Sequence, residues 1–428
     1  MIKKVLLALI VLTTSLAVFV VPLPKNSPSA IAIYLSAIAG YAGIMLLLWF
    51  YILGTKGVMK ILTKDLAPII DLHKMLGKYS VVLIFLHPLF VTISYGESWL
   101  YSLTPNLSTE FEKHVTYGRI ALAALLVVWI SSALLRSKMG YRPWKYLHLL
   151  AYISLPFALL HVPDTGSTFA HVFFAKLYFF VVLLGFGIFS LLRLRSALGF
   201  NKFYYTVRSN KLIADQTYLL TLRSDSIGGV LPRPGQYIYL KTGWFSEEHP
   251  FSVLANDEEK NELFVAYKVY GAFTRELAAL EQGEQVLVNG SFGTFTHHID
   301  EAPDRPVVYI AGGIGITPFV SRLLQEGSTR EQWLFYANRS SASAAFLRSL
   351  EKSLGARLIS IFTGSNDVHD DHKGRGAGFV GSFQKYLKDP VDYCYYLCGP
   401  VPLMESAENE LRRLGVRPED IHREAFSY

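Results

Sequence analysis

The chain has 428 residues, a net charge of +7 and 51% hydrophobic residues. Residues up to about 194 form a series of apolar runs, whereas the sequence from residue 201 onward has the charges, glycines and turns of a globular protein. Its basic residues flank apolar runs and form no stripe interleaved with exposed aromatics, which excludes a nucleic-acid-binding protein. The two cysteines, Cys394 and Cys398, imply no disulfide framework and suit a reducing compartment.

Six apolar stretches are candidates for membrane spans. They cover roughly residues 5–22, 31–53, 74–95, 117–135, 146–162 and 170–192. Most reach the ~20 residues that a bilayer requires, and the fifth is shorter. The first resembles a secretory signal, but no small-residue cleavage site follows it, so we interpret it as a retained helix.

Lysine and arginine gather in alternate loops between these spans. Basic residues precede span 1, lie between spans 2 and 3 and between spans 4 and 5, and follow span 6, whereas the opposite loops hold mostly acidic residues. The positive-inside rule therefore predicts a multi-pass protein of the cell membrane. Its N-terminus and its second half are both expected in the cytoplasm.

The third and fifth spans each carry two histidines, His73 with His87 and His148 with His161. Both spans run outward in the predicted topology, so His73 and His148 lie near the inner ends. Histidines of one span are ~20 Å apart along the helix. This predicts two levels, each with one histidine from each span, and a bis-histidine haem suits each level because iron takes an axial nitrogen from either side. The rival interpretation, a metal transporter, would use carboxylates or cysteines, which these spans almost lack.

The two histidine spacings differ in their helical geometry. Fourteen residues bring His87 to within about 40° of His73 around an ideal helix, whereas thirteen leave His148 and His161 roughly 140° apart. Pro156 lies between the latter two, and we expect it to kink or rewind the helix there.

The second half of the chain changes its pattern near residue 303. Before that point, short alternating segments separated by glycine and proline predict a small antiparallel barrel. After it, buried strands alternate with helical segments, which predicts a parallel α/β sheet. The expected fold is an all-α six-helix transmembrane domain at residues 1–200, a β-barrel domain at 201–302 and an α/β domain at 303–428.

Two glycine turns follow strands of the α/β domain. "AGGIGITP" permits close backbone approach, and the helix expected after it offers free N–H groups to a phosphate, with Pro318 in its first turn. "LCGP" at residues 397–400 ends another strand, so both turns are expected at one cleft. Arg339 and Ser340 follow a further strand, where a 2′-phosphate can be held; the alternative for Arg339 is a solvated surface charge.

Together these segments resemble the ferric reductase and NADPH oxidase superfamily, especially its bacterial NADPH oxidase-like members. The resemblance covers nearly the whole chain: spans 2 to 6 are similar to a ferric-reductase-type membrane domain, and the remainder is similar to a ferredoxin–NADP reductase module. It implies FAD, NADPH (with NADH possible) and two b-type haems as cofactors, the haem irons bound by His73, His87, His148 and His161.

The resemblance also implies the flavin and nucleotide contacts. "PGQY", "HPFS" and "GAFT" would bind FAD, through Pro234, Gly235, Gln236, Tyr237, His249, Pro250, Phe251, Ser252, Gly271 and Thr274. The nicotinamide nucleotide would contact Gly313, Gly315, Thr317, Pro318, Cys398, Gly399 and Pro400. In the C-terminal "REAFSY", Phe426 matches the aromatic that covers the flavin, and Tyr428 is a second candidate. Ser252, Cys398 and Phe426 are the expected catalytic residues.

The implied activity is transmembrane electron transfer. Electrons would pass from cytosolic NADPH through FAD and two haems to an acceptor outside, with O2, giving superoxide, favoured over a ferric chelate. Neither "PLFV" after His87 nor "AIYLSAIAGY" in span 2 supplies an additional Arg or His beside the outer haem. One alternative is an electron-transfer subunit that feeds an extracytoplasmic partner protein. Another is a transporter or scaffold that only senses nucleotide, which would show no haem spectrum.

Overall fold

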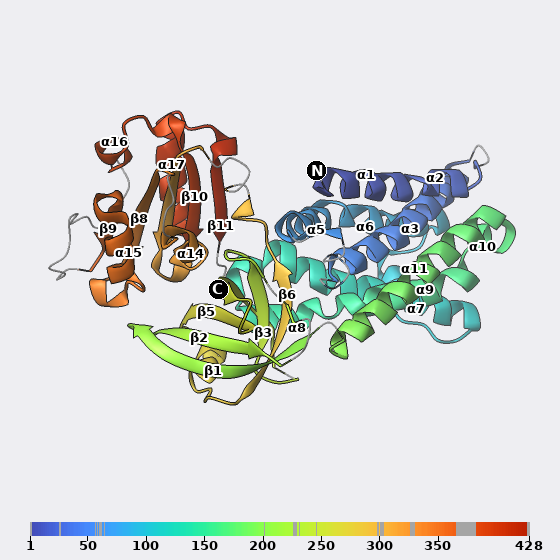
Figure 1. The fold of residues 1–428 in the computed structure, drawn as a ribbon. Coiled ribbons are helices and arrows are strands. Elements are labelled where there is room, and N and C mark those ends of the chain that lie inside the picture. Colours follow the sequence, from blue (N-terminus) through green and yellow to red (C-terminus); the bar gives the residue numbers. More distant parts are fainter. Residues whose placement is uncertain are drawn as a thin grey trace. The chain divides into compact units, whose positions relative to one another are not determined.

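The computed structural model describes residues 2–24, 27–55, 57, 59, 62–63, 65–200, 202–225, 229–230, 232–244, 246–297, 299, 304–325, 330–364 and 382–425. The chain divides into two compact units, residues 1–200 and 201–428 (Figure 1). The described part of the first unit is helical, and the second unit is built on a barrel and an open sheet.

The described residues of the first unit include six helical stretches that are long and apolar enough to cross a membrane, as the sequence predicts. They are α1 and α2 (Ile2–Ser15, Ala17–Val20), α3 (Pro28–Leu53), α5 and α6 (Ala67–Tyr79, Val81–Tyr95), α7 with a π-helical end (Glu110–Trp129, Ile130–Leu134), α8 and α9 (Tyr141–His148, Ala151–Thr165) and α11 (Phe173–Ala197). The fifth stretch, which was expected to be short, spans 25 residues. Large apolar side chains such as Phe19, Phe180 and Leu191 are exposed, as a lipid-facing surface requires.

Both histidine-bearing stretches are interrupted between their histidines. Between α8 and α9, the amides of Leu150, Tyr152 and Ile153 donate to carbonyls three residues earlier, and Leu149 makes such a bond as well. This tighter winding turns the chain about 120° per residue, against 100° in an α-helix. Four such residues reduce the expected 140° offset between the two histidines to about 60°. The rewinding that we expected at Pro156 is therefore found at residues 149–153, and Pro156 lies inside α9.

Residues 203–292 form a closed antiparallel barrel in the order β1-β2-β5-β4-β3-β6 (Figure 1). The strands are β1 (Phe203–Ala214), β2 (Thr217–Ser224), β3 (Tyr237–Lys241), β4 (His249–Asp257), β5 (Glu262–Lys268) and β6 (Gln285–Phe292). Inward side chains such as Val207, Leu222 and Val253 are fully buried, and Leu277 of α12 (Ala272–Ala278) packs against them. β4, which carries the "HPFS" segment, is the strand that the alternation pattern did not single out.

The remaining strands form a parallel sheet in the order β11-β10-β7-β8-β9. They are β7 (Val307–Gly312), β8 (Gln332–Asn338), β9 (Leu358–Phe362), β10 (Cys394–Gly399) and β11 (Ile421–Ala425). One face packs against α14 (Val320–Leu323) and α15 (Leu347–Leu354), and the other against α16 (Ser382–Tyr386) and α17 (Val401–Arg413). The predicted parallel α/β sheet is thus confirmed, and β11 is an additional edge strand.

A buried carboxylate joins the beginnings of β7 and β11. Asp420 accepts hydrogen bonds from Arg305 and Arg417, and its side chain is only 4% exposed. The hydrogen bond from Arg305, assisted by that from Arg417 and opposed by burial, holds the pKa of the Asp420 carboxyl below its ordinary value. A carboxyl with a depressed pKa stabilises the fold above its unfolded pKa of about 3.9, and this stabilisation is lost as the pH falls through the folded value.

We predict that Asp420→Asn lowers the free energy of unfolding of the second unit by about 1.5–3 kcal/mol at pH 7, because charged hydrogen bonds are lost. The difference from wild type should disappear as the pH falls through the folded pKa of Asp420. Urea-dependent hydrogen exchange of peptides from β10 and β11 in the full chain measures both effects. Glu419→Gln is the matched control, since the Arg417–Glu419 pair is exposed and should contribute little. Equal stability of the two variants would contradict the prediction.

Candidate functional site

The four histidines of the membrane stretches form two pairs across the helices. The ring centroids of His73 and His148 are 6.2 Å apart, and those of His87 and His161 are 6.0 Å apart. The rings of each pair are steeply inclined to one another, at 66° and 76°. The structure therefore brings together the same partners that were paired by depth in the sequence.

Backbone carbonyls orient the rings of the His87/His161 pair. Nδ1 of His87 lies 2.9 Å from the carbonyl oxygen of Ser36, and Nδ1 of His161 lies 2.8 Å from that of His114. A carbonyl oxygen only accepts, so each Nδ1 carries a proton and donates it. In a neutral imidazole the other nitrogen, Nε2, then keeps its lone pair, which is the form that binds metal ions.

The His73/His148 pair is held differently. Nδ1 of His148 lies 3.1 Å from Oγ of Ser132, which accepts a hydrogen bond from Nε1 of Trp144. Nδ1 of His73 is buried and has no hydrogen-bond partner among the described residues. Burying a polar atom without a hydrogen-bond partner costs free energy. We therefore expect a group outside the described residues to interact with the His73 ring.

Two glycines make room for the rings of the His87/His161 pair. A Cβ on Gly40 would lie 3.0 Å from Nδ1 of His87, and a Cβ on Gly118 would lie 2.8 Å from Nδ1 of His161. Both distances are shorter than ordinary van der Waals contact. Each histidine is therefore packed directly on the backbone of a neighbouring helix, α3 for His87 and α7 for His161.

The ring separations fit an iron ion between each pair. A metal bound at about 2 Å by one nitrogen of each ring, on the line between them, sets the two ring centroids roughly 6 Å apart. The protonated Nδ1 atoms of His87 and His161 suit bis-histidine ligation through Nε2. The residues present thus fit the haem groups that the resemblance implies.

A cavity of about 430 Å³ contains the His87/His161 pair in its wall. α3, α6, α7 and α9 contribute to the lining, together with residues of the segment that follows α6. Arg119 of α7 also lines this cavity, although the residual exposure of its side chain is only 5%. The segment after His87 and span 2 contain no additional Arg or His, and Arg119 lies instead in span 4. An arginine inside an apolar span was the signal that could have revealed it.

The "PGQY" and "HPFS" segments lie side by side in the barrel. Tyr237 of β3 pairs with Ser252 of β4, and Gly235 donates its amide to the carbonyl of Val253. Gly235 has a φ of +85°, and a Cβ there would lie 2.5 Å from the side chain of Thr296, so the turn requires glycine. The hydroxyl of Ser252 is buried and has no partner among the described residues, as expected of a group that meets a bound molecule.

The "GAFT" segment begins α12 beside the same part of the barrel. Oγ1 of Thr274 accepts hydrogen bonds from the amides of Tyr270 and Gly271, which closes the turn. The ring of Phe273 stacks on that of His249, with centroids 4.1 Å apart, so "GAFT" and "HPFS" are in contact. A Cβ on Gly271 would meet nothing within 4 Å. A cleft lined by Tyr270 and the basic Arg275 lies beside this turn.

The two glycine turns of the sheet pack backbone against backbone at the carboxyl ends of β7 and β10. A Cβ on Gly315 would lie 2.2 Å from the carbonyl oxygen of Cys398, and one on Gly399 would lie 2.9 Å from the amide nitrogen of Gly312. The chain order reverses between these two strands, at the point where such sheets bind ligands. Burial raises the pKa of the Cys398 thiol well above its ordinary value, so this side chain is a neutral thiol and a poor nucleophile.

The glycine turn after β7 does not lead directly into a helix, contrary to the prediction from the sequence. After "AGG" the chain makes a 3₁₀ turn at Gly313–Ile316, and α14 begins only at Val320. Thr317 and Pro318 therefore lie in a turn, and the helix expected directly after the glycines begins later and has four residues. Pro400 is the N-cap of α17.

Arg339 and Ser340 follow β8 at the same edge of the sheet as the glycine turns. Arg339 is exposed, and its carbonyl accepts a hydrogen bond from the amide of Gly364. Ser340 begins a short 3₁₀ turn and bonds with Ser343. Phe426 and Tyr428, the two candidates for covering the flavin, lie outside the described residues.

Two family models match the chain in the regions just described. Residues 39–159 match the ferric reductase-like transmembrane component, and residues 309–409 match the oxidoreductase NAD-binding domain. The chain therefore combines a ferric reductase-like membrane component with an oxidoreductase NAD-binding domain. Its domain combination is that of the ferric reductase and NADPH oxidase superfamily, as the sequence motifs predicted.

Curated relatives of this chain are named as electron-transfer subunits or components, or as flavohemoproteins. The electron transfer subunit of dihydroorotate dehydrogenase B from Fusobacterium nucleatum is 24% identical over 48% of this chain and 78% of its own length. A flavohemoprotein of Rhizobium meliloti is 32% identical over 34% of this chain, and the match spans only 37% of that protein. The electron transfer component of toluate 1,2-dioxygenase from Pseudomonas putida is 25% identical over 52% of this chain and 68% of its own length.

Solved structures show a weaker likeness. A flavohemoglobin from Malassezia yamatoensis with bound FAD and heme has a TM-score of 0.48 at 15% identity, over 94% of this chain and 99% of that one. The ferredoxin reductase in carbazole 1,9a-dioxygenase has a TM-score of 0.43 at 20% identity, over 53% of this chain and 69% of that one. Neither score reaches 0.5. The family matches support a multi-pass membrane domain fused to a module that binds flavin and nicotinamide nucleotide, which is an arrangement for transmembrane electron transfer.

We predict that Gly118→Ala destabilises the protein by about 1–3 kcal/mol, because the added methyl group overlaps the His161 ring. The matched control is Gly187→Ala in α11, where a Cβ would meet nothing within 4 Å. Replacing a helical glycine at such an open site should be neutral or add up to about 1 kcal/mol. Thermal unfolding of both purified variants measures the difference, and Gly118→Ala as stable as Gly187→Ala would refute the tight packing.

Proposed function

We propose that this protein carries electrons from cytosolic NADPH, through FAD and two b-type haems, to dioxygen on the opposite side of the membrane, with superoxide as product. The observation that carries this proposal is the pair of histidine couples, with ring centroids 6.2 and 6.0 Å apart, inside a ferric reductase-like membrane domain. When bound, FAD would supply the conversion of two-electron hydride chemistry to single-electron transfer, and the haems would supply single-electron transfer.

In this proposal the membrane residues fix the haem positions and insulate them. His73 and His148 hold one haem, and His87 and His161 hold the other, with ~20 Å of helix between the two histidines of one stretch. Carbonyl acceptors keep the Nε2 lone pairs of His87 and His161 available for the iron. The apolar helices exclude water and prevent electrons from leaving the path between the two haems.

The reductase residues orient the hydride donor and its acceptor. The buried hydroxyl of Ser252 is free to bond with the reactive nitrogen of the flavin, and His249, Phe251 and Phe273 line the isoalloxazine site. Arg275 in the cleft beside "GAFT" suits the pyrophosphate, since guanidinium groups bind phosphate oxygens well. The glycine turns of β7 and β10 bring backbone close to the nicotinamide. The neutral Cys398 shapes that site without reacting, and Arg339 and Ser340 select the 2′-phosphate.

A ferric chelate is the second candidate acceptor. The description of the matching membrane family, a ferric reductase-like component, favours it. A haem held by both His87 and His161 would need no open iron site for transfer to either acceptor, so the same set of residues would serve both. The predicted orientation, with the second unit in the cytoplasm, is part of this proposal and follows from the loop charges.

We predict that the purified protein contains two b-type haems and one flavin, and that their absorption bands change to those of the reduced forms on addition of NADPH. His148→Ala should lose the haem of the His73/His148 pair, and His161→Ala the haem of the other pair, because each iron then lacks an axial ligand. His171→Ala, at the exposed end of α10 (Ser167–His171), is the control and should retain both. Optical spectra with haem extraction measure the content. A colourless wild-type protein, or a His148→Ala variant with both haems, would overturn the assignment.

We also predict that NADPH-driven reduction of cytochrome c by the purified protein is suppressed by superoxide dismutase. Superoxide is then the species that leaves the protein, because the dismutase removes superoxide alone. The parallel assay supplies a ferric chelate under anaerobic conditions. Reduction of the chelate together with dismutase-insensitive cytochrome c reduction would replace dioxygen by ferric iron as the acceptor.

A further inference from the structure

Arg119 is a buried cation in the wall of the cavity that contains His87 and His161. It follows Gly118, on whose backbone the His161 ring is packed, and Arg119 and His161 both line this cavity. Of the Asp, Glu, Lys and Arg residues in the described part of the chain, Arg119 and Glu97 line the cavity. Glu97 is exposed, whereas Arg119 is buried. An arginine within an apolar span is expensive to bury and is retained where it has a partner or a ligand.

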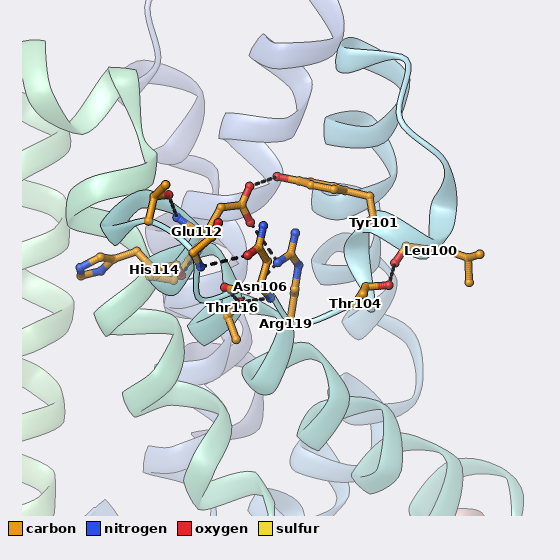
Figure 2. Close-up of polar contacts among 11 residues, drawn as sticks. Leu100, Tyr101, Thr104, Asn106, Glu112, His114, Thr116 and Arg119 are labelled. Carbon is orange, nitrogen blue, oxygen red and sulfur yellow. Dashed lines mark hydrogen bonds and ion pairs between the residues drawn. The ribbon is translucent and has the colours of Figure 1, made fainter.

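A network of polar contacts holds the guanidinium in place (Figure 2). Nη1 of Arg119 donates to Oε2 of Glu112 at 3.2 Å and to Oγ1 of Thr116 at 3.3 Å. The ring of Tyr101 lies 4.5 Å from the guanidinium carbon, and its hydroxyl donates to the other oxygen of Glu112. Thr116 in turn bonds with the backbone of Asn106, which fastens the segment between α6 and α7. The side chain is therefore fixed before any ligand arrives.

These contacts use one edge of the guanidinium and leave the other. All the hydrogen bonds that Arg119 makes within the described part of the chain come from Nη1, and its Nε is buried without a partner. Nε and Nη2 together form the fork that binds both oxygens of a carboxylate. If Arg119 only fastened the segment between α6 and α7, an unsatisfied buried donor would be a cost of about 1–3 kcal/mol with no return.

The chemistry of the cavity indicates what that edge binds. The group expected between His87 and His161 is a porphyrin that carries carboxylates, and a carboxylate inside an apolar cavity requires a cation or several hydrogen-bond donors. Arg119 is the buried cation available for this among the described lining residues. Glu112 already balances part of its charge, but the geometry leaves the bidentate edge free.

We propose that Arg119 forms a carboxylate-binding subsite in this cavity, in which its Nε–Nη2 edge binds a carboxylate of the haem held by His87 and His161. This inference rests on the proposed function, since it assumes that haem. Glu112 and Tyr101 are positioning residues that hold the opposite edge and the face of the guanidinium. The subsite selects the orientation of the porphyrin and anchors it independently of the iron–histidine bonds.

The test compares haem with haem dimethyl ester, which has no free carboxylate. The full-length protein and its Arg119→Gln variant are loaded with each group, and transfer to apomyoglobin is followed in the Soret region. The kinetic phase that His161→Ala removes identifies the relevant haem. With haem, Arg119→Gln should release this group about 10–100-fold faster than wild type, the loss expected for a charged bidentate contact. With the dimethyl ester, the two proteins should release it at the same rate.

Two further variants keep the test decisive. Arg119→Lys retains the charge without the fork and should release haem at an intermediate rate, so it carries the test if Arg119→Gln does not fold. Lys113→Gln removes a partly exposed cation of the same helix and should behave as wild type. Unchanged haem release in both Arg119 variants, or an equal acceleration with the ester, would overturn the subsite. A wild-type protein that binds no haem would instead overturn the proposed function itself.

Discussion

The approach of imidazole rings across the first unit is the constraint on which its other features depend. Ring centroids 6.2 and 6.0 Å apart require four histidines from two helical stretches to agree in depth and in direction. The depth of each histidine in the membrane follows from the number of residues that separate it from its neighbour on the same stretch. The direction of its side chain follows from the winding of the helix between them. Glycine at positions 40 and 118 then lets the neighbouring helices come close enough to support the rings. The carbonyls of Ser36 and His114 settle which ring nitrogen is left to bind a metal.

In the second unit, the close approach is between two stretches of backbone and not between side chains. The turns after β7 and β10 contact each other through Gly315 and Cys398, and through Gly399 and Gly312, so neither turn tolerates a side chain at the contact. Cys398 is enclosed as a neutral thiol at the centre of this arrangement. In both units, small residues create the close approach and neutral groups fill it.

Much of this architecture was predictable from the sequence, for identifiable reasons. Apolar length alone predicts the six membrane stretches, and the matching depths of His73 with His148 and of His87 with His161 predict the pairs. Alternation and glycine turns predict the barrel and the parallel sheet. β4 and β11 were not predicted as strands because "HPFS" and "IHREA" lack clear alternation, and their pairing depends on neighbouring strands. The rewinding at residues 149–153 was not predictable either, since no proline or glycine marks it.

Arg119 illustrates a different limit of the sequence. Its position in an apolar span was visible, but its place beside His161 depends on how α7 packs against α9, which no local pattern encodes. The segment between α6 and α7 contributes Tyr101 to the same network, so the surroundings of Arg119 combine a span with the connection that precedes it. A side chain whose surroundings depend on how helices pack can be identified only in the folded structure.

The tightly wound turn between α8 and α9 also restricts how this stretch can change in length. One residue added or removed between His148 and His161 would shift the depth of one ring by only about 1.5 Å but would rotate it by about 100° around the axis. A shift of that size is small beside the span, whereas the rotation would turn the imidazole away from its partner ring. The number of residues between His148 and His161 is therefore restricted by the direction of the rings far more than by their depth. The connections outside the spans have no such restriction.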